Sequence, residues 1–444
     1  MSQYRAYPAY KDSGIEWIGQ VPEHWKIAQI KRISALNPRK STLSEEKDSL
    51  CTFLPMEKLR TNAVTLDETR PIHEVYGGYS YFCDGDILIA KVTPCFENGN
   101  IAIANGLVNG IGFGSTEINV LRVNGKGHNR FLYYRLQEEQ FRTIAKSEMR
   151  GTGGLKRVPT DLFESFTIGL PDTDEQATIA ATLDRETARI DALIEKKNRF
   201  VELLKEKRQG LITHAVTKGL DRNAKMKDSG IEWIGHVPEH WEATKLKHVA
   251  AFSGGGTPSK ENPDYWNGCI PWVSPKDMKH EVITDSIDHI TTKGLENSAT
   301  KLIDSGAVLL VARSGILRHT IPVGINNVPV SLNQDMKALS LDETRVRPRF
   351  ILRWVQGLNR SLLGIWAKEG ATVESLEHEY VANTRLPLPD LKEQDAILAT
   401  LDLETARIDA LISKSEQSIT LLKERRAAFI TAAVTGQIDL RGKQ

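Results

Sequence analysis

The side chains best suited to acid–base chemistry in this chain are two glutamate–histidine pairs, Glu23–His24 and Glu239–His240. A glutamate beside a histidine has the residue types of a general acid and base. Both pairs lie in near-identical copies of one segment, KDSGIEWIGQVPEHW at 11–25 and KDSGIEWIGHVPEHW at 227–241. Turn-forming residues and large apolar groups accompany each histidine. This pattern favours a structural role for both histidines, within two compact segments that we call the docking elements.

Other catalytic signatures are incomplete in the sequence. The N-P-P-Y/F motif of an adenine methyltransferase is broken in the nearest strings, at 37–39 and 262–265, and no G-x-x-x-x-G-K-[ST] phosphate loop exists. A metal nuclease of the P-D…E-x-K kind would have to use Asp172, Glu195 and Lys197. Those residues lie in a predicted helix, where the carboxylates would not converge on a metal ion, and the second repeat copy lacks the matching glutamate. We therefore expect no catalysis by this chain itself.

A long repeat organises the rest of the chain. Residues 171–221 recur at 389–439 with a constant offset throughout. Matching apolar positions follow steps of 4, 7, 3 and 7, the a/d seam of a heptad, which predicts one long amphipathic helix in each copy. Polar seam residues, Lys197/Ser415 and Arg208/Arg426, would fix the register of two paired helices, although each helix could instead pack on its own domain. The apolar seam pairs are Ile190/Ile408, Ile194/Ile412, Val201/Ile419, Leu204/Leu422 and Leu211/Phe429.

The size and composition of the chain favour several domains in a reducing compartment. Its 444 residues suit roughly two to four domains. The 58 basic and 57 acidic residues nearly cancel, so net charge alone indicates no nucleic-acid partner. Four cysteines without a C-x-x-C pair argue against a zinc site or a disulfide framework. No apolar stretch reaches the length of a membrane span, and we expect a soluble, cytoplasmic protein.

Two segments of similar length, 26–170 and 242–388, share a predicted skeleton. Each has a strand signal, DGDILIAKV or SGAVLLVAR, followed by a polar turn, a helix with an aromatic stripe and a glycine-bearing loop. This order predicts two mixed α/β globules of the α+β class. Antiparallel pairing of the long helices would give a pseudo-twofold internal repeat, with each docking element packed on a helix end. The predicted boundaries are 1–170 for the first globule, 171–221 for the central helix, 222–388 for the second globule and 389–444 for the C-terminal helix.

The paired E-Q-x-x-I…L-D-x-E-T-A-R-I-D-A-L-I helices and the two docking elements resemble the specificity subunit of type I DNA restriction-modification systems. Residues 255–272, GGTPSKENPDYWNGCIPW, resemble the start of a target-recognition domain in that family. The resemblance covers the whole chain. It implies two target-recognition domains, each reading one half of a bipartite, asymmetric sequence in double-stranded DNA, separated by two long antiparallel helices.

The same resemblance implies the partners and cofactors. The helices would set the gap between the half-sites and hold two methyltransferase subunits, with two restriction subunits as further candidate partners. S-adenosylmethionine, ATP and Mg would belong to those partner subunits, and no cofactor or metal is expected in this chain.

Reading a DNA sequence requires polar side chains at base edges and lysine or arginine at phosphates. The loops of both globules supply such side chains, and we expect the rings of Tyr265, Trp266 and Trp272 to belong mainly to the core. In the first globule the candidate DNA-binding residues are Lys91, Asn98, Ser115, Thr116, Arg150, Thr152, Lys156 and Arg157. In the second globule they are Thr257, Ser259, Lys260, Tyr265, Ser274, Lys276, Arg313, Arg318, Lys368 and Thr372.

Two other functions are compatible with parts of this pattern. A helical scaffold could use its two globules to bind protein, and a self-contained enzyme could both read and cut DNA. The missing catalytic motifs argue against the enzyme. Salt-dependent binding to duplex DNA, strengthened by methyltransferase subunits, would separate a DNA reader from a scaffold.

Overall fold

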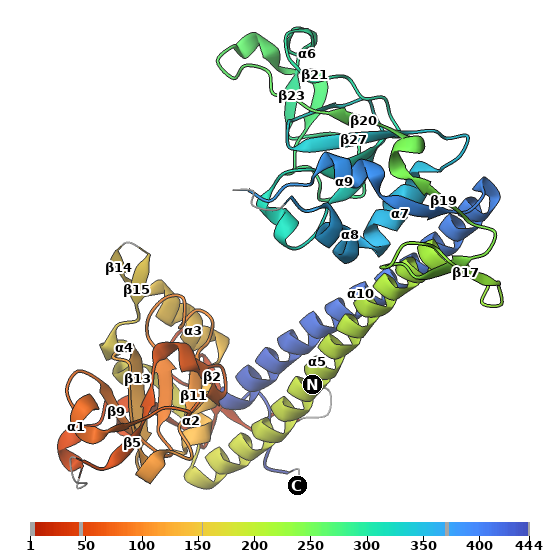
Figure 1. Cartoon of the computed structure of the whole chain (residues 1–444). Helices are drawn as coiled ribbons and strands as arrows, with labels where there is room; N and C mark the ends of the chain where they lie inside the picture. The colour runs from red at the N-terminus through yellow and green to blue at the C-terminus, as the bar shows by residue number, and fades with distance from the viewer. Residues whose placement is uncertain (1–4, 44–47, 153, 369–372, 443–444) are drawn as a thin grey trace. The chain divides into compact units, whose positions relative to one another are not determined.

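The computed structural model describes residues 5–43, 48–152, 154–368 and 373–442 (Figure 1). Contacts along the chain divide it into two compact units: unit 1 comprises Met1–Lys197 and Gln417–Gln444, and unit 2 comprises Asn198–Glu416. Each unit holds one globule, one docking element and part of both long helices. The division therefore runs through the helices, whereas the sequence-based boundaries keep each helix whole.

The globule of unit 1 is built on two four-stranded sheets with the orders β11-β10-β13-β4 and β8-β5-β12-β9. All four residues of β10 are buried, as expected for a short continuous apolar run. The first sheet consists of β4 (Ser34–Leu36), β10 (Ile87–Ala90), β11 (Ile101–Ile103) and β13 (Ile118–Val123). The second consists of β5 (Leu50–Leu54), β8 (Thr69–Pro71), β9 (Ser80–Cys83) and β12 (Ile111–Gly114).

Short helices and strand pairs complete unit 1. Its α-helices before the long one are α1 (Ile72–Val75), α2 (Asn129–Arg135), α3 (Glu139–Ser147) and α4 (Thr160–Ser165). The strand pairs are β1 (Tyr10–Asp12) with β2 (Gln20–Pro22), β3 (Lys26–Gln29) with β16 (Thr167–Leu170), β6 (Leu59–Arg60) with β7 (Ala63–Val64), and β14 (Arg150–Thr152) with β15 (Leu155–Arg157).

The globule of unit 2 contains a five-stranded sheet of order β20-β27-β24-β25-β22 and a three-stranded sheet of order β23-β21-β26. The five strands are β20 (Ala250–Gly254), β22 (Val282–Ile283), β24 (Val308–Val311), β25 (Val323–Asn326) and β27 (Met336–Leu341). The three strands are β21 (Trp266–Val273), β23 (Asp288–Ile290) and β26 (Ser331–Leu332). The remaining pairs are β17 (Met226–Asp228) with β18 (His236–Pro238) and β19 (Glu242–Lys245) with β28 (Arg385–Leu388). The short helices are α6 (Thr292–Glu296), α7 (Pro348–Gly357), α8 (Asn359–Trp366) and α9 (His378–Asn383).

The two globules share the predicted skeleton, down to strand register. Antiparallel strands β10 and β13 pair Leu88 with Val120, and β24 and β27 pair Leu309 with Ala338 at the equivalent place. The predicted aromatic helices are α2 and α7, whose rings lie in the cores of their units. The mixed α/β content and the internal repeat predicted from the sequence are therefore confirmed.

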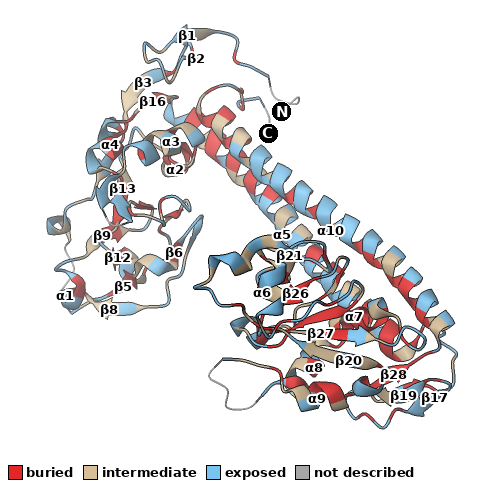
Figure 2. Cartoon of the chain, turned by 90° about the horizontal axis from the view of Figure 1, so that it is seen from above, coloured by how far each residue is buried: buried red, intermediate tan, exposed pale blue. Residues whose placement is uncertain are grey.

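The two long repeats form single helices, α5 (Thr173–Lys218, 46 residues) and α10 (Leu391–Val434, 44 residues). At about 1.5 Å per residue, α5 is roughly 69 Å long. Asp172 and Asp390 cap the two N-termini by accepting from the backbone N–H three residues ahead, at 2.9 and 2.8 Å. Buried residues alternate with exposed ones along both helices (Figure 2), and most apolar seam positions are buried.

The helices run antiparallel within each unit. In unit 1, Leu183 shares a core with Val434, and further along α5, Asp191 pairs with Arg426 at 3.0 Å. In unit 2, Val216 shares a core with Leu401, while Arg208 pairs with Asp409 at 2.9 Å. The two ion pairs are repeat-equivalent, since Asp409 and Arg426 occupy the positions of Asp191 and Arg208 in the second repeat copy. The predicted antiparallel pairing is confirmed, and the seam arginines form cross-helix ion pairs in both units.

Each docking element packs on the ends of the long helices. In unit 1 the Tyr10 hydroxyl donates to the carbonyl of Gly436 at 3.1 Å, and His24 contacts Glu175 in the first turn of α5 at 2.7 Å. In unit 2, His240 contacts Glu393 in the first turn of α10 at 2.8 Å. These contacts support the structural interpretation of both histidines.

Candidate nucleic-acid interface

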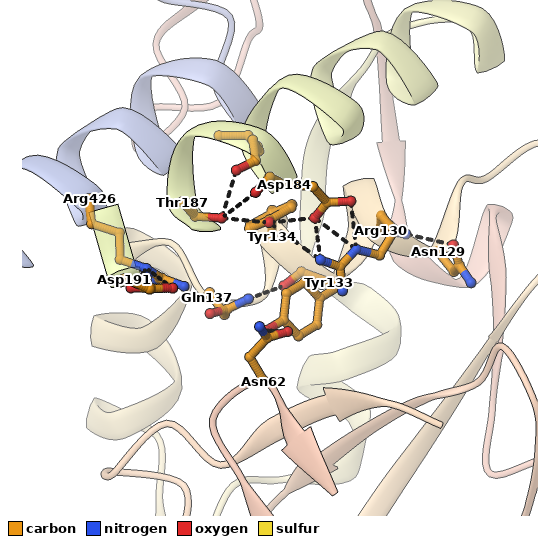
Figure 3. A network of polar contacts seen from close by, with 11 residues as sticks. Asn62, Asn129, Arg130, Tyr133, Tyr134, Gln137, Asp184, Thr187, Asp191 and Arg426 are labelled. Atoms are coloured by element: carbon orange, nitrogen blue, oxygen red, sulfur yellow. Dashed lines mark hydrogen bonds and ion pairs between the residues drawn. The ribbon is translucent and has the colours of Figure 1, made fainter. Parts of the chain in front are cut away.

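A polar network fixes helix α2 of unit 1 to α5, and so positions the globule that carries the candidate loops (Figure 3). The Tyr134 hydroxyl donates to Asp184 at 2.6 Å and contacts the Thr187 hydroxyl at 3.1 Å. Arg130 Nε donates to the same aspartate at 2.9 Å. Burial, and then the hydrogen bond to Asp184, raises the pKa of Tyr134 above its usual range, so that the phenol stays a donor.

Unit 2 uses equivalent residues for the same purpose. Arg349 Nη2 donates to Asp402, the repeat equivalent of Asp184, at 2.7 Å. Arg353 takes the place of Tyr134 on α7 and lies 3.4 Å from Asp402 and 3.0 Å from Glu281. Both globules are therefore fastened to a long helix through one aspartate, while the surrounding groups differ.

Three segments meet at the candidate surface of unit 1: the loop after β10, the turn before β13 and the β14–β15 hairpin. Lys91 N donates to the carbonyl of Glu117 at 2.9 Å, and Thr93 N donates to that of Lys156 at 2.9 Å. Strand pairing then places Arg150 opposite Arg157. These bonds bring together most of the predicted residues: Lys91, Ser115, Thr116, Arg150, Thr152, Lys156 and Arg157.

The remaining predicted residue of unit 1 lies at the far end of the same loop. Asn98 is exposed, and its carbonyl accepts from Thr61 Oγ1 at 3.4 Å. Among the clustered residues, Arg157 is held by Glu117 through three hydrogen bonds of 3.2, 2.9 and 2.7 Å. The hydrogen bond from Arg157 is the main cause that lowers the pKa of Glu117 below its ordinary value.

The candidate surface of unit 2 is hollowed instead of hairpin-shaped. A groove of about 680 Å³ lies beside β21, and Trp266 and Trp272 line it with their rings edge to face at 5.1 Å. Trp272 is buried, as predicted, whereas Trp266 and Tyr265 are only half-buried. Of the predicted residues, Thr257, Lys260, Ser274 and Lys276 line this groove, together with Ser314, Asn333, Gln334 and Asp335.

The groove residues differ in their availability. Thr257 Oγ1 contacts Gln334, and Lys260 and Lys276 are exposed. The Ser274 hydroxyl is buried and donates to Asp277 at 2.8 Å, so it is already used inside the protein. Ser259 is exposed, with its carbonyl accepting from Trp266 Nε1 at 3.0 Å.

The other predicted cations of unit 2 are exposed and paired with carboxylates. Arg313 contacts Asp335 at the groove at 2.7 Å, Arg318 contacts Glu374 at 2.5 Å, and Lys368 contacts Glu377 at 3.3 Å. The hydrogen bond to Glu374 raises the pKa of Arg318. The last predicted residue, Thr372, lies outside the described residues.

The structure adds surface residues that the sequence analysis did not single out. Leu155 and Val373 are exposed next to Lys156 and Glu374 in the chain, at positions related by the offset of the long repeat. Glu117 and Asp335 are related by the same offset and hold candidate arginines in both units. Aligning the two globules by this offset would have found all four, because each pair keeps its chemical type.

All four cysteines, Cys51, Cys83, Cys95 and Cys269, are free thiols. Across the described ranges there is no cluster of three or more histidine, cysteine or acidic side chains suited to a metal ion. No helix in the described part of the chain is both long and apolar enough to cross a membrane.

Sequence comparison places the duplicated fold in a family. The family model of the type I restriction modification DNA specificity domain matches twice, at residues 22–203 and 238–421. The chain belongs to this family. Because each match spans a globule and much of the following helix, the repeat seen in the structure is a repeat of the family domain.

Relatives of known description agree with this assignment. The chain is 31% identical over 225 residues to the Escherichia coli type I restriction enzyme EcoR124I/EcoR124II specificity subunit, covering 50% of this chain and 48% of that one. The chain thus spans about half or less of the length of the first curated relatives it matches. It is 22% identical over 436 residues to the putative type I restriction enzyme MjaX specificity subunit of Methanocaldococcus jannaschii, covering 96% of each chain.

Solved structures share the fold at low sequence identity. One such chain comes from a structural study of complex assembly and conformational transition of the type I R-M system. It superposes with a TM-score of 0.76, at 18% identity, covering 94% of this chain and 99% of that chain. The HsdS subunit from Thermoanaerobacter tengcongensis gives a TM-score of 0.58, at 18% identity, covering 94% and 98%.

Proposed function

We propose that this chain is the DNA-specificity subunit of a type I restriction-modification complex, and that each unit reads one half of a bipartite, asymmetric site in duplex DNA. The observation that carries the proposal is the duplicated family domain with one shared framework and two different candidate surfaces. A repeated scaffold with variable loops is typical of proteins that bind through loops. The subunit itself would catalyse no step.

The two surfaces support different half-sites because their shapes and side chains differ. Unit 1 offers an exposed hairpin with Arg150, Lys156 and Arg157, a form that suits a groove of DNA. Unit 2 offers a groove lined by tryptophan and polar side chains, with Arg313 at its rim. Two such surfaces would recognise two unrelated base sequences, which accounts for an asymmetric target.

The long helices fit the second part of the role, which is to set the spacer and hold methyltransferase subunits. Leu193 on α5 and Leu421 on α10 are exposed in unit 1, close to the level of the Asp191–Arg426 pair. Their repeat equivalents, Leu411 and Leu203, are exposed in unit 2. Large exposed apolar side chains often mark protein–protein contacts. One equivalent site per unit is consistent with two methyltransferase subunits.

The cofactors of the reaction then belong to the partners. S-adenosylmethionine would be bound by the methyltransferase subunits, and ATP and Mg by restriction subunits where these are present. This chain contributes the choice of sequence, in the cytoplasm, where the DNA of a bacterial or archaeal cell lies.

Binding measurements test the proposal against a protein-binding scaffold. The chain is titrated with duplex DNA at several salt concentrations, first alone and then assembled with the methyltransferase subunits of its system. We expect the logarithm of the affinity to fall linearly with the logarithm of the salt concentration. The affinity should also rise when the methyltransferase subunits are added. An affinity for duplex DNA that changes neither with the salt concentration nor with the partner subunits would instead support the scaffold.

A further inference from the structure

The candidate surfaces of the two units share a carboxylate at the same framework position. Glu117 directly precedes β13, and Asp335 directly precedes β27. The carbonyl of Glu117 accepts from the N–H of Lys91 at 2.9 Å, and that of Asp335 accepts from the N–H of Ala312 at 2.7 Å. Each acidic residue is therefore fixed by its backbone to the residue that follows β10 or β24.

Each of these carboxylates holds an arginine from a different segment. Arg157 of the hairpin donates from Nε and Nη2 to the two oxygens of Glu117, at 2.9 and 2.7 Å. Arg313 donates from Nε to Asp335 at 2.7 Å. The arginine side chains are 48% and 52% exposed, against 27% and 24% for their acidic partners. The arginine is thus the outer group of each pair, and the carboxylate is the inner group.

This arrangement leaves directed donors on the outer face. A guanidinium bound through Nε and one Nη2 proton retains three N–H donors, two on Nη1 and one on Nη2, and Arg313 retains the donors of both Nη groups. The bonds from Nε and Nη2 of Arg157 to Glu117 fix the plane of that guanidinium as well as its position, whereas the bond from Arg313 to Asp335 fixes the position of Nε. Guanine presents O6 and N7 as two acceptors that a correctly oriented guanidinium binds together in the major groove.

The carboxylate argues for base reading over simple phosphate binding. A residue that only neutralises phosphate binds it more strongly when the local charge is positive, and an adjacent carboxylate reduces that charge. A residue that reads a base edge is more selective when its N–H donors point in a fixed direction. The carboxylate fixes that direction. A carboxylate at the same framework position binds an arginine in both units, and the arginine comes from different segments, which indicates that a directed guanidinium is the shared requirement.

We propose that Arg157 and Arg313 each read a guanine in the half-site of their own unit, and that Glu117 and Asp335 are the positioning residues that orient them. This inference rests on the proposed function and specifies one base contact in each half-site.

Competition binding tests the assignment with the full chain assembled with its methyltransferase subunits. The wild-type motif is first mapped by genome-wide methylation sequencing, and duplexes with single replaced base pairs then compete with it. We expect the wild type to prefer one guanine in each half-site by roughly ten- to hundredfold. Glu117→Gln should reduce that preference to within about threefold at one position of one half-site, and Asp335→Asn should do so only in the other half-site.

Two further variants separate base reading from charge. Arg157→Lys keeps the charge but cannot make the forked contact, and should lose the same preference as Glu117→Gln. Lys156→Gln, changed at the adjacent exposed cation, should weaken binding to all duplexes alike and leave the preference intact.

Several results would overturn the proposal. They are a half-site motif without guanine, an equal loss of affinity for every duplex in Glu117→Gln, or a variant that no longer assembles, which would make the pair a folding contact. A wild-type assembly without any sequence preference would instead refute the proposed function itself.

Discussion

In both units the docking element contacts a glutamate in the first turn of a long helix, but the glutamate of unit 1 has more side-chain contacts than that of unit 2. In unit 1, Glu175 is almost fully buried and accepts from Tyr7 at 2.8 Å, from Trp25 Nε1 at 3.2 Å, and contacts His24 at 2.7 Å. Burial, and then the hydrogen bond to Glu175, raises the pKa of Tyr7 above its usual range. In unit 2, the equivalent Glu393 is partly exposed and contacts His240 alone among these groups.

The difference follows from how the chain passes through each joint. In unit 2, residues 219–226 connect α5 directly to the second docking element. In unit 1 the same place is filled by two separate segments, which meet where Arg5 pairs with Asp439 as an isolated β-bridge. Side-chain contacts on Glu175, including one with Arg441 at 3.8 Å, hold these two segments at the joint. In unit 2 the continuous backbone does this. A repeat can therefore keep its geometry while different interactions stabilise its two copies.

Truncating the tryptophan of each docking element should give the largest effect and sharpen this comparison. Trp25 and Trp241 are both fully buried, and Trp→Ala in a core typically costs roughly 3–5 kcal/mol. Trp25→Ala also removes the hydrogen bond to Glu175, whereas Trp241 Nε1 has no partner among the described residues. We expect Trp25→Ala to be the more destabilising by about 1 kcal/mol, measured by urea unfolding. Equal losses would mean that the additional bond in unit 1 contributes nothing.

Lengthening the helices tests whether the two units behave as separate bodies on a spacer. The stretch of α5 from Asp191 to Arg208 has the same length as the stretch of α10 from Asp409 to Arg426. Duplicating Ala192–Glu195 adds about 6 Å and turns the following helix by roughly 40°. A matched four-residue insertion after Leu422 keeps both ion pairs in register.

We expect the double insertion to widen the gap in the methylated motif by one or two base pairs, at about 3.4 Å per base pair, with both half-site sequences unchanged. The single insertion in α5 alone should lower stability, because it shifts Arg208 relative to Asp409 when Asp191 and Arg426 stay paired. An active double variant with an unaltered gap would show that another element sets the spacing.

Most of the framework could be predicted from the sequence, because the sequence contains two copies of its long helix and of its docking element. The heptad seam, the docking elements and the strand before each candidate loop have residue patterns that determine local structure directly. The Glu175 cluster could not be predicted in the same way, since Tyr7 and Arg441 are at opposite ends of the chain.

The candidate surfaces were predictable only as collections of polar loop residues. The sequence does not indicate that Arg157 comes back to Glu117 across a hairpin, or that Ser274 donates its hydroxyl proton to Asp277. These contacts depend on how loops fold over the sheet ends, where no periodic pattern constrains them. The exposed Leu155 and Val373 were not predictable in this way, because an apolar loop residue has no polar group that suggests contact with DNA.

Replacing the joint histidines should produce a smaller effect than the tryptophan changes. His24→Ala removes a contact with an almost fully buried carboxylate, for which we expect a loss of about 1–2 kcal/mol. His240→Ala removes a contact with a partly exposed carboxylate and should cost less than about 1 kcal/mol. The two variants are compared by urea unfolding at neutral pH. A larger loss from His240→Ala would contradict the view that unit 1 depends more on its side chains.

Acidification should give the smallest effect, and one part of it comes from the Glu117–Arg157 pair of unit 1. The pKa of Glu117 is lower in the folded chain than its ordinary value, mainly through the hydrogen bond from Arg157. The stabilisation is therefore complete above the ordinary pKa of about 4.5 and is lost as pH falls through the lower folded value. It should amount to less than about 1 kcal/mol, because the pair is partly exposed. Glu117→Gln should remove this part of the pH dependence, as seen by comparing unfolding of the variant and the wild type between neutral and acidic pH.

The central claim is that each unit reads its own half-site, and a domain exchange tests it most directly. Residues 26–170 are replaced by the matching segment of a relative with a different recognition sequence, leaving the docking element, both long helices and unit 2 unchanged. The methylated motif of the chimera is then read across the genome of a host that carries it with the methyltransferase subunits. We expect one half of the motif to change to that of the relative, while the other half and the gap stay the same. A change in both halves of the motif would contradict the account.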